Sequence, residues 1–237
     1  MRRCVTTLAI LLSLLAGAGI SFGKTTENKE TPEMVKTGLE TLPAEDAKTR
    51  YTTLTEADFR KVASRLGVEV AAIKAVVVIE AGPKMEGFWA PGVPVMNFDQ
   101  SMYNKYKSKA TSKGNPSEKV PTGLSGYALK EWTQLVAARK VTVDGANMGA
   151  FWGMFQIGGF NYKLCGCQSV AEFVKLMSYS ELEQLELFAT FIINSGMVND
   201  LKNKNWSNFA RRYNGASYAK RGYHTKMADA YKKFKGK

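Results

Sequence analysis

Histidine and cysteine are nearly absent from this sequence of 237 residues, and their scarcity excludes several kinds of active site. His224 is the only histidine, which argues against a zinc site built on histidines and against Ser–His or Cys–His catalysis unless His224 serves alone. Apart from Cys4, the cysteines are Cys165 and Cys167, one residue apart. This spacing gives a strained disulfide and a poor half of a zinc site, so we expect buried or free thiols. We therefore expect no metal site and no cofactor.

Long apolar runs are also rare, and the one that stands out lies at the N-terminus. Arg2 and Arg3 precede an almost unbroken apolar stretch over residues 5–15, and small residues follow up to residue 23. This order is typical of a secretory signal peptide over residues 1–23. The stretch is shorter than the roughly 20 residues of a membrane span, although a retained N-terminal anchor is the alternative. We expect a periplasmic or extracellular protein with no transmembrane segment after signal cleavage.

Acidic residues are outnumbered, with 33 Lys and Arg against 21 Asp and Glu, a formal net charge of +12. An exported protein of this charge is attracted to polyanions, and the bacterial envelope contains such polymers. Anionic envelope polymers are therefore candidate partners. Nucleic acid is the other usual explanation for basic charge, but export makes it the weaker one and we expect none to be bound. A charge excess that serves only solubility is the remaining alternative.

The chain divides into a leader, a polar tether and one domain. Residues 24–50 are polar and contain two prolines, which favours a flexible tether. The domain is expected over residues 51–237. It opens with a capping box at residues 55–58, and apolar residues at helical spacing predict a helix that ends at Gly67.

A second helix is predicted from about residue 69 to 80, although its β-branched run makes a strand the competing interpretation. Residues 86–98 are rich in glycine, proline and aromatics, which predicts a short hairpin or irregular flap, and residues 105–123 predict an exposed loop. Helical patterns resume near residue 124 and occupy most of the remainder. They include two capping boxes, at residues 169–172 and 180–183, a core helix with an apolar stripe of Leu182, Leu185, Phe188, Ala189 and Ile192, and a closing helix over 223–234. The fold class is therefore mainly α, with a small β or irregular flap after the second helix.

Four segments carry candidate chemistry. Glu80 ends the second predicted helix before a glycine turn, and burial there would keep its carboxyl protonated near neutral pH, as an acid catalyst of glycosidic cleavage needs. A half-exposed, solvated glutamate is the structural alternative. The segment 152–159 contains Gln156 between glycines, and 212–215 is an Arg-Tyr-Asn-Gly turn; each also fits a purely structural role. Asp99 lies in the predicted flap.

The order of these segments, Glu after a helix, then Gly-x-x-Gln-Ile, then Tyr-Asn-Gly, resembles the lysozyme-like superfamily. More narrowly, the chain resembles the N-acetylmuramidase domain family found in many phage endolysins and bacterial envelope proteins. The resemblance covers roughly residues 53–233. Its matching stretches are residues 66–76, 79–82, 152–157, 160–162 and 210–215, with further matches between Tyr218 and Tyr231.

The resemblance implies a lysozyme-like fold and a peptidoglycan hydrolase that cleaves the β-1,4 bond between N-acetylmuramic acid and N-acetylglucosamine. It makes Glu80 the catalytic acid. The residues that it implies for substrate binding are Trp152, Phe155, Gln156, Tyr213, Asn214 and Tyr218. Two departures put subsite fit in doubt: Phe98-Asp99-Gln100-Ser101 replaces the family's usual Phe-Glu-Arg-His, and Gly149-Ala150-Phe151 replaces small serines.

Three mechanistic alternatives remain at the level of sequence. Inverting hydrolysis needs a second carboxylate roughly 6.5–9.5 Å from the acid, for which Asp99 is the first candidate and Glu86 the second. Without a positioned base, a lytic transglycosylase reaction would leave 1,6-anhydro ends. A wall-binding protein without catalysis is the third alternative.

Overall fold

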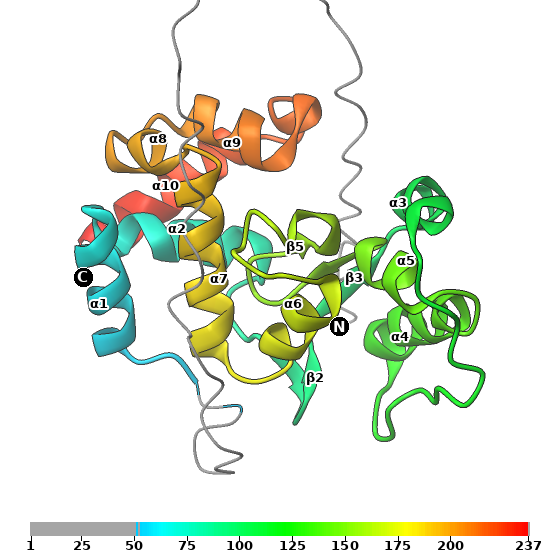
Figure 1. Cartoon of the computed structure of the whole chain (residues 1–237). Coiled ribbons are helices and arrows are strands. Elements are labelled where there is room, and N and C mark those ends of the chain that lie inside the picture. The colour runs from blue at the N-terminus through cyan, green and yellow to red at the C-terminus, as the bar shows by residue number, and fades with distance from the viewer. Residues whose placement is uncertain (1–50, 52, 237) are drawn as a thin grey trace, which may run out of the picture.

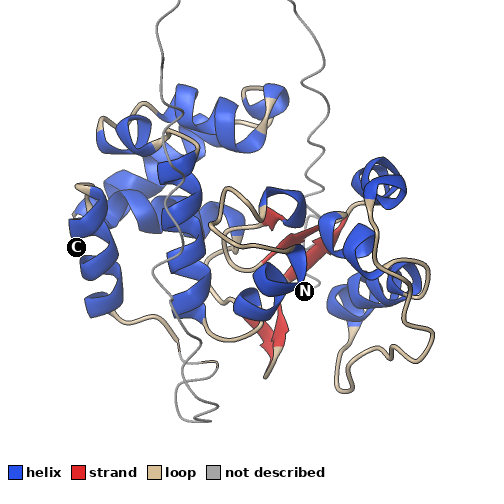
Figure 2. Ribbon diagram, viewed as in Figure 1, coloured by secondary structure: helices blue, strands red, loops and turns tan. Residues whose placement is uncertain are grey.

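The computed structural model describes residues 51 and 53–236, and within them the chain forms ten α-helices and five short strands (Figure 1). The predicted signal peptide and tether lie outside the described residues. No helix in this part of the chain combines the length and apolar character that a membrane crossing requires. The mainly helical fold class is confirmed, and Figure 2 shows the strands as a small patch between two groups of helices.

The first two helices form as the sequence predicts, and the second one places Glu80 at the domain interior. Thr55 caps α1 (Glu56–Leu66) with a reciprocal capping box, and Gly67 ends that helix with a left-handed φ of 63°. The β-branched run forms α2 (Val70–Glu80), not a strand, because α2 is buried in the core on most of its surface. Packing therefore decides the conformation of this segment over its local β preference.

The flap after α2 contributes three strands to two small antiparallel sheets. The strands are β1 (Phe88–Ala90), β2 (Val93–Pro94), β3 (Met96–Phe98), β4 (Ala150–Trp152) and β5 (Ile157–Gly158). β1 pairs with β2, and the second sheet has the order β3-β4-β5. Asn97 lies opposite Phe151, which in turn lies opposite Gly158. This second sheet joins the flap to the Gln156 segment, a link that the sequence did not predict.

A group of helices follows the flap, namely α3 (Gln100–Tyr106), the 3₁₀ turn Lys107–Lys109, α4 (Gly126–Arg139) and α5 (Val143–Met148). The prediction of a loop from residue 105 was therefore wrong at its start, since residues 105–109 are helical. The helix was missed because its Lys- and Ser-rich end resembles a loop. Asp99 begins α3 by accepting a hydrogen bond from the Met102 amide at 2.9 Å.

The C-terminal half contains α6 (Val170–Met177), α7 (Glu181–Asn194), α8 (Val198–Lys202), α9 (Trp206–Asn214) and α10 (Tyr223–Lys235). The predicted closing helix is confirmed as α10, which packs along α2. Ser169 and Ser180 cap α6 and α7 as predicted. The glutamates of the two predicted capping boxes behave differently. Glu172 accepts a hydrogen bond from the Gln168 amide, whereas one oxygen of Glu183 is buried without a partner.

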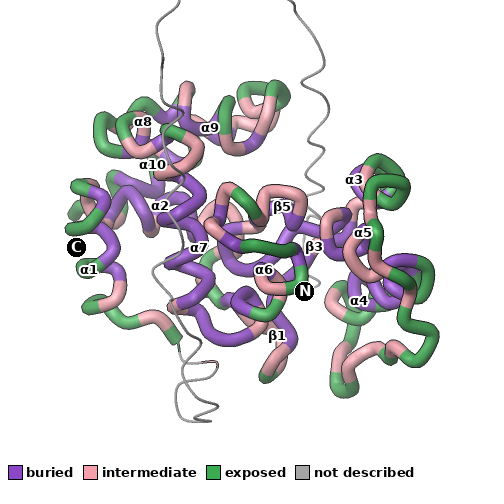
Figure 3. The backbone as a smooth tube through the Cα atoms, in the orientation of Figure 1, coloured by how far each residue is buried: buried purple, intermediate pink, exposed green. Residues whose placement is uncertain are grey.

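Helix α7 is the central helix of the domain and is buried on nearly all sides (Figure 3). The predicted apolar stripe is buried except for Leu182, which is partly exposed. Glu181 and Gln184, which an amphipathic pattern assigns to a solvated face, are buried instead. Buried polar side chains require hydrogen-bond partners. Glu181 accepts from the Leu54 and Gly87 amides, and Gln184 is bonded to the flap and to the Gln156 segment.

Candidate active site

Glu80 is the last residue of α2, and its carboxylate is turned into the protein. Its Oε1 accepts a hydrogen bond from Asn214 Nδ2 at 2.8 Å, whereas Oε2 is buried and has no partner among the described residues. Part of the residue remains exposed, but this oxygen does not. Burial raises the pKa of Glu80 to about 7, and the hydrogen bond from Asn214 opposes this shift only in part. A substantial fraction of the carboxyl is therefore protonated at neutral pH.

Glu80 opens into a small pocket at the junction of α2, the β3-β4-β5 sheet, α7 and α9. The other lining residues are Phe151, Gln156, Ile157, Gly158, Phe160, Asn161, Phe191, Tyr213 and Asn214. Three phenylalanines and a tyrosine form its walls, and three amide side chains point polar groups at it. Glu80 is the only carboxylate among these lining residues. The pocket thus combines a proton donor with apolar walls and hydrogen-bonding amides.

Gln156 is held at the pocket by the tight turn between β4 and β5. Gly153 and Gln156 both have a positive φ, 71° and 48°, which is unusual for a residue with a side chain. Gln156 Nε2 donates to the Gly153 carbonyl at 2.8 Å, so the turn fixes the amide orientation. The Gln156 Oε1 atom has no protein partner within the described residues and can accept a hydrogen bond from a ligand.

Gln184 of α7 fastens this turn to the flap. Its Oε1 accepts from the Met154 amide at 2.8 Å, and its Nε2 donates to the carbonyls of Gly87 at 3.1 Å and Met177 at 2.9 Å. A Cβ at Gly87 would lie 2.5 Å from Gln184 Oε1, and one at Gly153 would lie 2.8 Å from it. Both glycines therefore allow the backbone to approach this one amide closely.

Replacing Gln184 with leucine should lower the free energy of unfolding by at least about 3 kcal/mol. The substitution nearly keeps the volume but leaves three buried backbone groups unpaired, each of which costs about 1–3 kcal/mol. Chemical denaturation measures the loss. Gln134→Leu is the matched control, because Gln134 is exposed on α4 and its replacement should change stability by less than about 0.5 kcal/mol. Equal stabilities of the two variants would contradict this role of Gln184.

The end of α9 supplies the opposite wall. Tyr213 donates its hydroxyl to the Phe155 carbonyl at 2.6 Å, and its ring stacks on Phe209 with centroids 5.3 Å apart. Asn214 follows and is buried; its Nδ2 contacts Glu80 while its Oδ1 is buried without a partner. Gly215, with φ of 78°, turns the chain away directly after Asn214.

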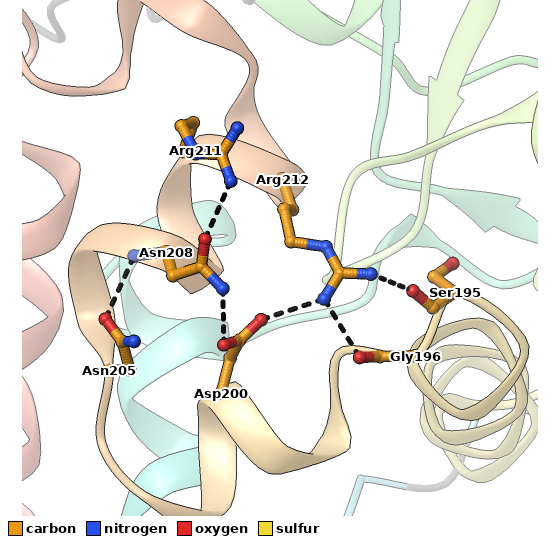
Figure 4. Close-up of polar contacts among 7 residues, drawn as sticks. All are labelled: Ser195, Gly196, Asp200, Asn205, Asn208, Arg211 and Arg212. Atoms are coloured by element: carbon orange, nitrogen blue, oxygen red, sulfur yellow. Dashed lines mark hydrogen bonds and ion pairs between the residues drawn. The ribbon is translucent and has the colours of Figure 1, made fainter. Parts of the chain in front are cut away.

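Arg212 anchors this end of α9 to the preceding helices (Figure 4). Its guanidinium donates to the carbonyls of Ser195 and Gly196, just past the C-terminus of α7, and forms an ion pair with Asp200 of α8 at 2.9 Å. Positive charge is favourable at a helix C-terminus, where carbonyl groups lack intrahelical partners. The Tyr-Asn pair is thereby fixed relative to α7, which also carries Phe191 of the pocket.

A family model described as N-acetylmuramidase matches residues 69–235. The chain belongs to the N-acetylmuramidase family. The crystal structure of the Burkholderia AP3 phage endolysin is similar, with 34% sequence identity and a TM-score of 0.62. The match covers 78% of this chain and 71% of that one. None of the curated proteins compared with the chain matches it. The family resemblance inferred from sequence is confirmed, and the chain is a lysozyme-like glycoside hydrolase.

Several residues expected at the site of this muramidase domain lie elsewhere. Trp152 and Phe155 are fully buried, and a fully buried side chain has no surface to offer a substrate. Trp152 Nε1 donates to the Asn147 carbonyl at 2.9 Å, and Phe155 stacks on Phe188 with centroids 4.1 Å apart. Both side chains support the pocket from behind. Their place in the motif indicated the right segment but not their orientation.

Asp99 and Tyr218 are not among the residues that line the pocket. The Asp99 carboxylate caps α3, and the Tyr218 ring meets His224 edge-on with centroids 5.4 Å apart. The structure thus brings together Glu80, Gln156, Tyr213 and Asn214 from the predicted set, and leaves the other four outside the pocket lining.

The pocket also contains residues that sequence reasoning missed. Phe151, Phe160, Asn161 and Phe191 line it, although 151 was noted only as a departure from the family pattern. Tyr223 of α10 is buried, and its pKa is raised to about 12 by burial and by the negative charge of Glu80. Phe160, Asn161 and Tyr223 lie in stretches that match the family pattern, whereas no sequence signal separated Phe191 from an ordinary core aromatic.

The muramidase domain has no group of three or more metal-binding side chains among its described residues. Both cysteines near residue 165 are buried free thiols, as the sequence predicted. Burial raises the pKa of each thiol, so neither is activated as a thiolate.

Proposed function

We propose that the protein cleaves the β-1,4 bond between N-acetylmuramic acid and N-acetylglucosamine in peptidoglycan, with Glu80 as the general acid. The observation that carries this proposal is the buried carboxyl of Glu80 in a pocket, with its pKa raised to about 7. A glycosidic oxygen is a poor leaving group unless it is protonated, and a carboxyl that retains its proton near neutral pH can supply it.

The amides around Glu80 suit a substrate that carries acetamido groups and hydroxyls. Asn214 donates a hydrogen bond to Glu80 Oε1, so the unpartnered Oε2 is left to carry the catalytic proton. Gln156 and Asn161 offer further donors and acceptors at the same pocket. The aromatic walls contribute to the burial that raises the pKa of Glu80.

Asp99, the first candidate for the water-activating base, caps α3 with its carboxylate and is not among the residues that line the pocket. Glu86, the second candidate, has a side chain that is 60% exposed and lies 3.7 Å from Lys84. A single carboxylate at the pocket favours a second candidate function, lytic transglycosylase activity. In that reaction the muramic acid 6-hydroxyl attacks in place of water and forms a 1,6-anhydro end.

We also propose that residues 1–23 direct export, that residues 51–237 form the catalytic domain, and that the protein acts in the periplasm or outside the cell. Residues 24–50 would tether the domain, and its positive charge would favour anionic envelope polymers. The support for this is the order of charged, apolar and small residues at the N-terminus and the excess of basic residues.

Mass spectrometry of purified peptidoglycan after digestion tests the reaction. We expect products with reducing N-acetylmuramic acid ends, because hydrolysis adds water across that bond. Products with 1,6-anhydromuramic ends would instead assign the transglycosylase reaction. Reducing N-acetylglucosamine ends would contradict the proposed bond.

A further inference from the structure

A small aromatic surface lies beside the Glu80 pocket and belongs to two segments far apart in the sequence. Trp89 of β1 and Tyr127 at the start of α4 meet edge-on, with ring centroids 6.0 Å apart and planes at 88°. Tyr127 is 38% exposed, which makes it one of the few large apolar side chains that reach the surface. The other three tryptophans of the chain, at 132, 152 and 206, are buried, whereas Trp89 is partly exposed.

An amide group completes this surface. Tyr127 donates its hydroxyl to Asn97 Oδ1 at 2.8 Å. Burial and the nearby Glu131 carboxylate raise the pKa of Tyr127 to about 12, so the hydroxyl remains a donor at neutral pH. The Asn97 amide nitrogen has no protein partner within the described residues. It retains two N–H groups for an acceptor on a ligand.

The register of the sheet connects Asn97 to the Glu80 pocket. Asn97 lies directly opposite Phe151, and Phe151 lies directly opposite Gly158. Residues that lie opposite each other in antiparallel strands project from the same face of a sheet, with Cβ atoms about 5 Å apart. Phe151 and Gly158 both line the pocket. The row from Gly158 to Asn97 therefore leads from the pocket wall to the Trp89–Tyr127 pair.

We propose that Trp89, Tyr127 and Asn97 form a sugar-binding subsite that holds the glycan strand beyond the bond to be cleaved. Aromatic rings with an exposed face, a phenol hydroxyl and a free amide donor match the apolar faces, hydroxyls and acetamido groups of N-acetylated sugars. Such a subsite would make longer glycan strands the preferred substrate, and this inference rests on the proposed function.

Binding of glycan strands of two and eight sugars to the Glu80→Gln variant tests this subsite without cleavage. Adding Trp89→Ala or Tyr127→Ala should weaken binding of the eight-sugar strand by about 10-fold, because each variant lacks one aromatic ring that contacts a sugar. Binding of the two-sugar fragment should stay unchanged. Leu129→Ala is the matched control, since Leu129 is 42% exposed on the same helix and points away from Tyr127.

Intrinsic fluorescence gives a second measurement of the same contact. Because the other tryptophans are buried, the eight-sugar strand should change the emission of Trp89 alone, and Trp89→Phe should abolish that change. Folding of each variant is checked by its thermal unfolding. Unchanged affinity of the eight-sugar strand in both alanine variants would overturn the subsite, even if Glu80→Gln abolishes cleavage. Retained cleavage by Glu80→Gln would instead overturn the role of the acid and leave the binding result standing.

Discussion

Replacing Glu80 with glutamine should reduce cleavage of peptidoglycan by at least about 100-fold, within the 10²–10⁴-fold range typical of a lost general acid. Glutamine keeps the size of the side chain and can still accept the hydrogen bond from Asn214 Nδ2. It cannot give a proton to the leaving oxygen. The expected result is therefore a loss in kcat with substrate binding retained, measured by release of muropeptides and by sedimentation with insoluble peptidoglycan.

Two matched variants separate the acid from other carboxylates. Glu86→Gln alters an exposed side chain of the flap and should retain activity close to that of the parent. Asp99→Asn keeps an equally good cap for α3, because Asn and Asp are comparable at that position. It should therefore retain both fold and activity. A loss of 100-fold or more in Asp99→Asn would identify Asp99 as the base, and full activity of Glu80→Gln would exclude Glu80 as the acid.

The sequence predicted the parts of this site that depend on local signals. The capping box at Thr55, the left-handed stop at Gly67 and the apolar spacing in α2 place Glu80 at the end of a buried helix. Capping and periodicity act over a few residues, so a single sequence reveals them. The turn after Asn214 was accessible for the same reason, because Gly215 follows it.

The parts that the sequence did not reveal depend on pairing across the chain. The Asn97–Phe151 register joins segments more than 50 residues apart, and nothing in either three-residue strand specifies its partner. Gln184 was hidden for a related reason: a polar residue on a helix is usually solvated. Only the approach of the Gly87 and Met154 backbones explains its burial.

The sequence also did not reveal which way the side chains of a recognised motif point. Trp152 projects from one face of the sheet, and Phe151 and Gly158 belong to the other, because neighbouring residues in a strand alternate. The motif therefore contains both pocket and core residues. The choice between them depends on which face α4 covers, and Trp132 of α4 meets Trp152 edge-on.

The stability of the folded protein should fall as pH rises from about 4.5 to about 7, through the titration of Glu80. The pKa of Glu80 is 4.5 in the reference state and about 7 in the folded protein, so the folded state binds the proton more tightly. Stability from this proton is fully present below pH 4.5 and is lost as pH rises through 7. The shift corresponds to at most about 3 kcal/mol, and the partial exposure of the residue reduces that figure.

The Glu80→Gln variant isolates this contribution, because glutamine is neutral in both the folded and the unfolded state. Its free energy of unfolding relative to the parent should increase between pH 4 and pH 8 by about 1–3 kcal/mol and then level off. Urea denaturation at several pH values measures the difference, and Glu86→Gln, which alters an exposed carboxylate, should show no comparable increase. A constant difference between Glu80→Gln and the parent across this range would mean that Glu80 titrates like a solvated carboxylate. Glu80 would then not hold its proton near neutral pH, because the desolvation that lowers stability above pH 7 is also what retains the catalytic proton.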